Sequence, residues 1–222
     1  MYESLLCLPF FQGMGKDDIT AILDKVTFEF IKYNDGDTVC RCGDTCGKFI
    51  IMTQGAMEAY ATSPDGTYKV SEEIHPPHAI EPYSMFGHSA VYQREYRAKG
   101  NCTVLAIEKK FLFSELNRHD IFTINLLNII SLKAQKLNGI IWDHTPSSIS
   151  GRITHFIASR CETLHGRKSI TIKMERLATI LCETRLNISK SLNEMQEAGL
   201  LELHRKEIII PSFNKLIEAY LI

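Results

Sequence analysis

Hydrophobic positions recur at helical spacing near both ends of the chain and alternate at a period of two between them. The apolar residues of KDDITAILDKV (Lys16 to Val26) share one face and predict a short helix. From Thr27 to Ile107 the period is two, in the segments FEFIKY, KFIIM, AMEAYAT, TYKVSEEI and TVLAI, separated by NDGD, CGD, QG, SPDG and HPPH. Short strands separated by turn residues predict an antiparallel sandwich or barrel.

The segment from Ile121 to Trp142 predicts a long helix with two apolar stripes. Phe122, Leu126 and Ile129 form one stripe, which can cover the chain's own barrel. The other stripe follows alternating steps of four and three, the spacing of a coiled-coil seam, and begins at Thr123. We expect it to pair with a second copy of the chain, although a single helix buried in a larger core is the alternative. The expected dimer contacts are Leu127, Ile130, Ala134, Leu137 and Ile141.

After a hinge at WDHTPSS, the C-terminal part alternates between helical and strand patterns. A helix from Ile149 to about Leu164 precedes the loop HGRKS, the strand ITIK and the short helix MERLATIL. A second helix and LELHRKEIII, two strands joined by a turn at Arg205 to Glu207, complete the order of a winged helix-turn-helix. We therefore predict an α+β protein with a jelly-roll-like β-roll (1–120), a dimerisation helix with its hinge (121–145) and a winged helix-turn-helix domain (146–222).

The stretch TRLNISKSLNEMQEAGLL, from Thr184 to Leu201, has one apolar face and one polar face at helical spacing. Ile188, Leu192 and Met195 form the stripe that should pack on the preceding helix. The opposite face shows Leu186, Lys190, Asn193 and Glu197. A solvated amphipathic helix explains the stripe but does not explain the wing that follows. We therefore expect the polar face to enter a DNA major groove.

Each polar position at the start of this helix has a chemical match on DNA. Thr184 is a good N-cap, and its helix end suits a phosphate. Arg185 can form a bidentate contact with guanine, and Leu186 can touch a thymine methyl group. Lys190 can reach a base or a phosphate. The remaining candidates, which suit phosphate oxygens, are Asn187 and Ser189.

Composition and charge narrow the class of protein. The 222 residues are 45% hydrophobic, which suffices for two small domains. The net charge is −1, but the part from Pro146 onward carries +3 and the remainder −4. No apolar run is long enough for a membrane helix and no signal peptide is evident, so we expect a soluble, cytoplasmic protein without a membrane partner. Seven cysteines without framework spacing favour reduced thiols.

Taken together, the motifs resemble those of the CRP/FNR family of transcription regulators. The resemblance rests on the turn glycines of NDGD, CGD, QG, PDG and FG, and on GRI, LATIL, TRLNISKSL and EMQEAGLL near the C-terminus. It implies a cyclic-nucleotide-binding-type β-roll and a homodimer that binds a palindromic DNA site, with RNA polymerase as a further candidate partner. Arg185, Leu186 and Lys190 fall on the base-contacting positions. Leucine replaces an acidic residue and lysine an arginine, so the preferred DNA site should differ.

The sensory half departs from the cyclic-AMP-binding members of the family. Those proteins hold the ribose and phosphate with a Gly-Glu pair and a downstream arginine, whereas here Gly87 is followed by His88. We therefore predict weak or no cyclic AMP binding. The expected effector pocket comprises Gly87, His88, Ser89, Arg94 and Arg97. Haem, suggested by relatives and by the histidines of HPPH (His75 to His78), has little support because two prolines indicate a rigid turn.

The motif VCRCGDTCG invites a metal hypothesis. Cys40, Cys42 and Cys46 offer thiolates for zinc or an iron-sulfur cluster, with a fourth ligand from Cys7, Cys102 or a histidine. Their spacing matches neither a zinc knuckle nor the cysteine group of oxygen-sensing relatives. Strand alternation instead predicts Cys40 and Cys42 as small core residues on one face. We expect no metal.

The sequence is compatible with three classes of function to different degrees. An enzyme is poorly supported, because no nucleophile-base pairing, metal triad or phosphate loop occurs at workable spacing. A ligand-binding dimer whose winged helix contacts a protein partner is the second reading. The leading reading is a sequence-specific DNA-binding regulator modulated by an effector in the β-roll.

Overall fold

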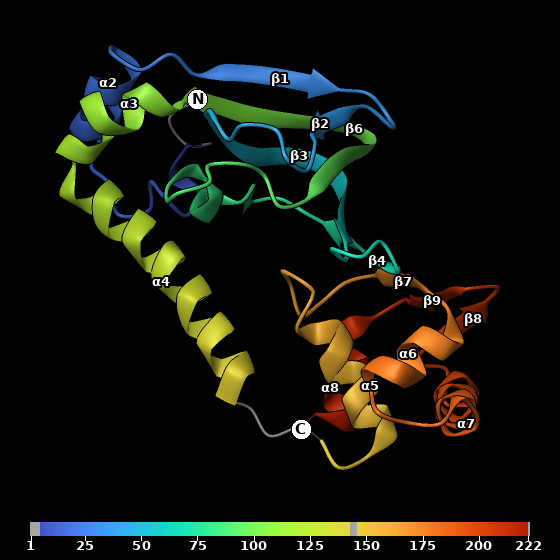
Figure 1. Ribbon diagram of the computed structural model, residues 1–222. Coiled ribbons are helices and arrows are strands. Elements are labelled where there is room, and N and C mark those ends of the chain that lie inside the picture. Colours follow the sequence, from blue (N-terminus) through green and yellow to red (C-terminus); the bar gives the residue numbers. More distant parts are fainter. Residues whose placement is uncertain (1–4, 143–145, 222) are drawn as a thin grey trace. The chain divides into compact units, whose positions relative to one another are not determined.

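The computed structural model describes residues 5–142 and 146–221 and divides them into two compact units (Figure 1). The first unit contains the described residues of Met1–Met57 and His75–Trp142. The second contains Glu58–Ile74 and the described residues of Asp143–Ile222. The hairpin Glu58–Ile74, which sequence order had assigned to the N-terminal domain, therefore packs with the C-terminal part of the chain.

The first unit is built on antiparallel strands. Strand β1 (Glu29–Tyr33) pairs with β6 (Glu95–Glu108) from Glu29↔Ala106 to Tyr33↔Cys102. β2 (Thr38–Cys40) also pairs with β6, and β5 (His78–Ala79) pairs with β3 (Lys48–Thr62). These pairings confirm the predicted antiparallel β-roll.

Long strands replace the shorter ones expected from the sequence. KFIIM and AMEAYAT, predicted as two strands separated by a turn at QG, are one strand, β3, so the expected turn is wrong. Gly55 has φ +86° within β3, and a Cβ there would lie 2.3 Å from the carbonyl oxygen of Asn101. A glycine at this point lets the strand bend sharply without ending, because it adopts the left-handed region and leaves room for the neighbouring backbone.

Helices cover one end of the first unit. The short helix predicted between Lys16 and Val26 is confirmed as α2 (Lys16–Leu23), and the long helix is α4 (Asp120–Trp142). Phe122 and Leu126 of α4 are buried, and the Phe122 ring lies 5.5 Å from that of Phe11. Phe122 and Leu126 therefore cover the unit's own core, as predicted, whereas Ile129, the third residue of the predicted stripe, is only partly buried. The remaining elements are η1 (Pro82–Met85), α3 (Lys109–Ser114) and η2 (Leu116–Arg118).

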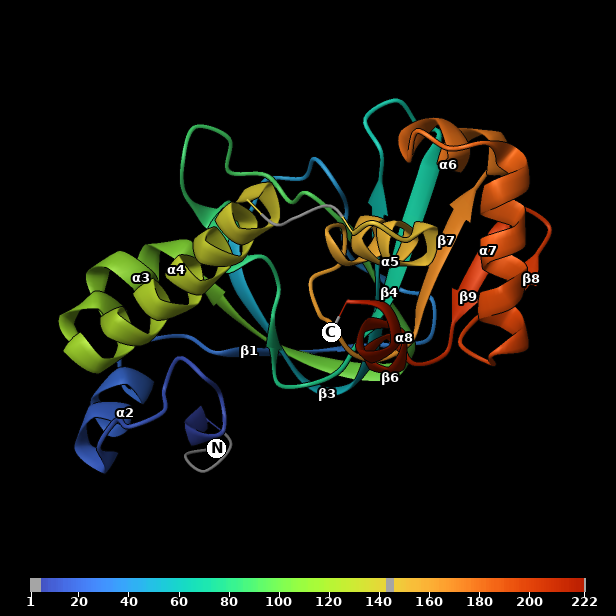
Figure 2. The same ribbon diagram turned by 90° about the horizontal axis from the view of Figure 1, so that it is seen from below.

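The second unit has the order helix, strand, helix, helix, hairpin, as predicted. Its sheet has the strand order β4-β7-β9-β8, with β4 (Tyr68–Ile74) supplied by the hairpin (Figure 2). The helix α5 (Ile149–Ala158) ends earlier than the expected Leu164, and a C-terminal helix that was not expected, α8, adds Phe213 and Leu216 to the core. The other elements are β7 (Lys168–Ile172), α6 (Met174–Ile180), α7 (Arg185–Glu197), β8 (Glu202–His204), β9 (Glu207–Ile210) and α8 (Phe213–Tyr220).

Candidate nucleic-acid interface

Helix α7 begins with a formed cap and has a fully buried stripe. Thr184 is the N-cap, and its hydroxyl oxygen accepts a hydrogen bond from the backbone N–H of Asn187 at 3.1 Å. Ile188, Leu192 and Met195 have no exposed surface and belong to the core of the second unit. The predicted register of this helix is therefore confirmed, and its opposite side is available to a partner.

The available side carries the residues expected to contact DNA. Leu186 is 78% exposed, more than any other large hydrophobic side chain among the described residues. The side chains of Arg185 and Lys190 are 70% and 78% exposed. Asn187 is exposed and Ser189 partly exposed. One turn and a half of helix thus presents an arginine, a leucine and a lysine that contribute little to the protein's own packing.

A charged network not anticipated from the sequence holds the turn before α7. Arg152 on α5 forms an ion pair with Glu183 and donates a hydrogen bond from Nη1 to the carbonyl oxygen of Leu181 at 3.0 Å. The Asn187 side-chain amide donates to Glu183 at 3.1 Å. The amide of Asn187, and then the guanidinium of Arg152, lower the pKa of Glu183 below its ordinary value. In the sequence, the GRI motif, in which Arg152 follows the buried Gly151, was the feature that could have pointed to this network.

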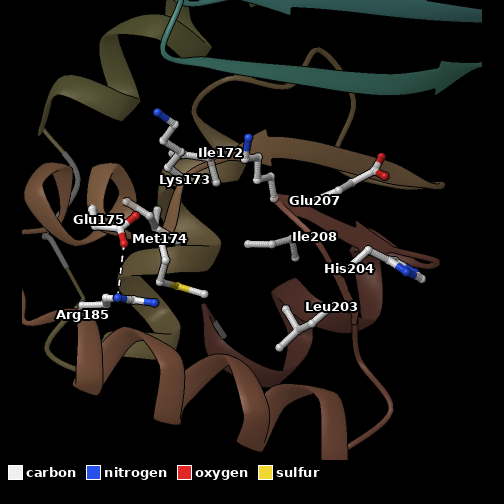
Figure 3. Close-up of a pocket in the computed structure, with 11 residues that line it drawn as sticks. Ile172, Lys173, Met174, Glu175, Arg185, Leu203, His204, Glu207 and Ile208 are labelled. Carbon is white, nitrogen blue, oxygen red and sulfur yellow. Dashed lines mark ion pairs between the residues drawn. The ribbon is translucent and has the colours of Figure 1, made fainter.

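A cavity of about 280 Å³ opens between the start of α7 and the strands β8 and β9 (Figure 3). Its walls are apolar at Met174, Leu203 and Ile208. Arg185 lines the same cavity, and its Nη1 lies 3.3 Å from Oε1 of Glu175 (Figure 3). This exposed ion pair is weak enough for a phosphate or a base to replace Glu175. The ammonium groups of Lys173 and Lys206 and the imidazole of His204 belong to residues that also line this cavity.

The expected effector residues do not surround either cavity described in the first unit. These cavities have volumes of about 490 Å³ and 290 Å³ and are lined by other residues. Gly87, His88 and Ser89 are exposed, Arg94 is partly buried, and Arg97 forms an ion pair with Glu95. The effector pocket stays a prediction.

A buried carboxylate that the sequence reading missed lies in the segment before these residues. Glu81 has no exposed surface and has φ 40°. Its Oε2 accepts hydrogen bonds from the hydroxyl of Ser84 and the backbone N–H of Gln93, both at 2.7 Å. These bonds hold the loop Pro82–Gln93 at both ends around a buried carboxyl group, whose burial would be costly without such donors.

The three cysteines of VCRCGDTCG do not lie together on one face. Cys40 and Cys46 are buried, but Cys42 is exposed, so the expected shared face of Cys40 and Cys42 is wrong. Strand β2 ends at Cys40, and the alternation that would bury Cys42 ends with it. In the described parts of the chain, no group of three or more His, Cys, Asp or Glu residues could hold a metal ion.

The first three residues of HPPH connect β4 to β5, which begins at His78, and the predicted turn between strands is confirmed. His75 is exposed and His78 is partly buried, with a cis peptide bond between Pro76 and Pro77. No cavity described in the first unit is lined by both histidines. Haem therefore gains no support from this segment.

The stripe of α4 expected to form a dimer is exposed in the single chain. Leu127 is 56% and Leu137 50% exposed, Ala134 is exposed and Ile130 is partly exposed. The side chain of Ile141 lies outside the described residues. Exposed aliphatic side chains on one helix are unfavourable in water. Their pairing with a second copy of the chain stays a prediction.

Comparisons with known proteins agree with this architecture. Residues 30–119 match the cyclic nucleotide-binding domain family. The chain is 20% identical over 227 aligned positions to a CRP-like cAMP-activated global transcriptional regulator of Mycobacterium tuberculosis, covering 97% of this chain and 98% of the relative.

Two solved structures share the fold. A protein assigned to the CRP/FNR family from Eubacterium rectale superposes with a TM-score of 0.52 at 16% identity, covering 97% of this chain and 99% of that one. The N-terminal domain of a transcriptional regulator from Streptomyces coelicolor gives a TM-score of 0.50 at 20% identity, covering 65% and 99%. Within residues 5–142 and 146–221, none of the helices has the length and apolar character needed to cross a bilayer.

Proposed function

We propose that the chain is a transcription regulator of the CRP/FNR type, a class of proteins that are not enzymes, and that it binds a palindromic double-stranded DNA site as a homodimer. The proposal is supported by the cyclic nucleotide-binding domain match at residues 30–119 and by the CRP-like relative that aligns with 97% of the chain. The observation that carries this proposal is helix α7, whose capped N-terminal end is exposed while its opposite face is buried. Two α7 helices related by a two-fold axis would enter successive major grooves about one helical turn apart. We also propose that the dimer contacts RNA polymerase and that the protein is cytoplasmic.

The exposed residues at the start of α7 form two groups, those that can contact bases and those that can contact phosphates. Arg185 offers two parallel N–H donors to the O6 and N7 acceptors of guanine, and Leu186 offers an apolar contact to a thymine methyl group. Lys190 follows about one turn later and can reach a base or a phosphate. Thr184, Asn187 and Ser189 position the helix through phosphate oxygens and do not specify sequence.

We further propose that an effector acts through the cyclic nucleotide-binding domain at residues 30–119. Cyclic AMP, which activates the Mycobacterium tuberculosis relative according to its description, is not part of this proposal. His88 follows Gly87, where cyclic-AMP binders carry a carboxylate, and His88 is exposed. Whatever the effector, it can shift DNA binding only by binding two arrangements of the protein unequally.

Arg185→Ala tests the proposal directly. Loss of a bidentate base contact should weaken binding to the specific site by about 1–3 kcal/mol and change binding to random DNA little. The measurement is fluorescence anisotropy with DNA from upstream of the protein's own gene at two salt concentrations. Binding of the unmodified chain should fall steeply as salt rises, because phosphate contacts release counterions.

Lys215→Ala is the matched control, since Lys215 is an exposed cation on α8 and not on α7. It should bind as the unmodified chain does. If Arg185→Ala and Lys215→Ala behave alike, α7 does not read DNA bases. Absence of salt-sensitive binding would instead favour a protein partner for the winged helix, with the exposed Leu186 as its contact.

A further inference from the structure

The hairpin Glu58–Ile74 completes the sheet of the second unit. Its strand β4 pairs antiparallel with β7 over five residues, from Tyr68↔Ile172 to Glu72↔Lys168 (Figure 2). On its other side β7 pairs with β9. Without the hairpin, β7 would be an edge strand with unpaired backbone groups, which folded proteins normally cover or shield.

A buried ion pair fastens the hairpin to β7. The side chains of Glu72 and Lys168 have no exposed surface, and Nζ of Lys168 lies 2.8 Å from Oε2 of Glu72. The carboxylate also accepts backbone N–H bonds from Glu162 at 2.7 Å and Thr163 at 3.1 Å. Lys168 additionally donates to the Thr163 hydroxyl at 2.6 Å. A lysine buried this completely is tolerated because the hairpin supplies its counter-charge.

The hairpin also contributes to the core beneath the pair. Val70 is 1% exposed and belongs to the same hydrophobic cluster as Ile170 and the buried residues of α7. The Tyr68 ring packs at 5.4 Å against Phe156 on α5, and Nε of Arg160 donates to the Tyr68 hydroxyl at 2.8 Å. Helix α5, which also contacts α7, therefore packs partly on residues of the hairpin.

The tip of the hairpin reaches the first helix of the helix-turn-helix. Arg176 on α6 pairs with Asp65 at 2.6 Å and donates from Nε to the Thr67 hydroxyl at 3.0 Å. Donated hydrogen bonds from Ser63 and Thr67, together with the charge of Arg176, lower the pKa of Asp65 to about 2. Asp65 is thus held in the form that binds Arg176.

We propose that the hairpin Glu58–Ile74 is a positioning element of the DNA-binding unit and that Glu72 is its main positioning residue. Strand β3 begins in the first unit, and its residues from Glu58 on belong to the second. The chain of β3 continues into the turn that carries Asp65, and Asp65 contacts Arg176 on α6, so β3 is linked to the helix-turn-helix by a path that does not include α4. The DNA readout of this inference rests on the proposed function.

Glu72→Gln tests the inference in the full-length protein. The substitution leaves a buried lysine without a carboxylate, so the hairpin should detach from β7 for a larger fraction of the time. Because apparent affinity falls with the competent fraction, binding to the specific DNA should weaken about tenfold or more. Hydrogen exchange of the β7 amides, followed by mass spectrometry, should accelerate. Glu218→Gln, at an exposed position on α8, is the matched control and should change neither quantity.

A disulfide between β4 and β7 should restore the attachment of the hairpin that Glu72→Gln weakens. Ser71 and Ser169 are paired in register and their hydroxyl oxygens lie 3.0 Å apart, so cysteines at both positions have the proximity that a disulfide needs. Oxidised glutathione takes two electrons and two protons from these thiols and becomes two reduced molecules. In the S71C/S169C/E72Q protein, oxidation should restore DNA affinity to within about twofold of S71C/S169C, and dithiothreitol should remove the gain. S71C/E72Q, treated identically, controls for the native cysteines.

Several results would overturn the inference. It fails if the unmodified chain binds DNA and E72Q binds equally well, in which case the proposed function stands. It fails equally if the S71C/S169C disulfide does not form, or forms without restoring binding.

If the unmodified chain binds no DNA, the proposed function fails. Unchanged hydrogen exchange of the β7 amides in E72Q would then refute the positioning role of the hairpin separately. Should E72Q aggregate, Asp65→Asn replaces it: faster exchange of α6 supports the inference and unchanged exchange refutes it.

Discussion

At the scale of single residues, burial separates cysteines that are neighbours in sequence. Cys40 and Cys46 are buried, whereas Cys42 is exposed and its thiol donates to the carbonyl oxygen of Gln93. Burial, reinforced by the negative charge of Glu81, raises the pKa of Cys40 above its ordinary value. Burial likewise raises the pKa of Cys46. Both thiols therefore stay protonated at neutral pH and are poor nucleophiles.

Alkylation of the native protein with iodoacetamide should accordingly be selective. Cys7, Cys42 and Cys182 are exposed and should be modified first, because the reagent reaches them. Cys40 and Cys46 should react only after denaturation. Peptide mass spectrometry across a time course provides the measurement, with urea-unfolded protein as the control. Rapid modification of Cys40 in the folded protein would contradict the burial described above.

At the scale of elements, glycine allows the long strands of the first unit to bend. Gly55 in β3 and Gly100 in β6 both have positive φ. At Gly55 the backbone of Asn101 and Cys102 approaches so closely that a side chain has no room, whereas around Gly100 nothing lies within 4 Å of an added Cβ. A period of two that continues on both sides of a glycine is therefore compatible with one bent strand as well as with two.

Gly55→Ala should destabilise the protein by about 2 kcal/mol or more, because left-handed strain adds to a collision with rigid backbone. Gly36→Ala is the matched control, since Gly36 also has positive φ, +80°, but nothing lies within 4 Å of its Cβ. It should cost about 1 kcal/mol from the strain alone. Urea unfolding of the two variants would measure the difference. Equal losses would show that β3 and β6 do not approach this closely at Gly55.

At the scale of the whole molecule, the proposed binding to a palindromic DNA site requires two chains. The exposed stripe of α4 supplies the surface that a second copy would cover, whereas Phe122 and Leu126 are already buried in the same chain. A two-fold axis along such a seam would also explain why the DNA site should be a palindrome.

Leu127→Asp combined with Leu137→Asp should convert the proposed dimer into a monomer of 25.2 kDa, because each charge would be buried against its symmetry-related copy. Sedimentation velocity measures the mass directly. Asn128→Asp introduces the same charge beside the stripe and should leave the dimer intact. A double variant that stays dimeric would place the interface outside α4.

The sequence by itself determined the elements whose signal is local. The cap at Thr184, the buried stripe of α7, the packing of Phe122 and Leu126 and the period of two in the roll all follow from residues within a few positions of one another. Their prediction succeeded because a helix or a half-buried strand needs one apolar face wherever it packs. The exposed positions of α7 expected to contact DNA follow from the same periodicity.

Only the tertiary structure decided which distant segments share a core. Glu72 and Lys168 are 96 positions apart, and nothing in either local pattern indicates that this lysine is buried or that the hairpin joins the second unit. The same holds for Arg152 and Glu183, whose contact depends on how α5 packs, and for Cys42, whose exposure depends on where β2 ends. Which remote strands pair, and which remote charges meet, depends on how whole elements pack. The periodicity within one segment does not indicate either.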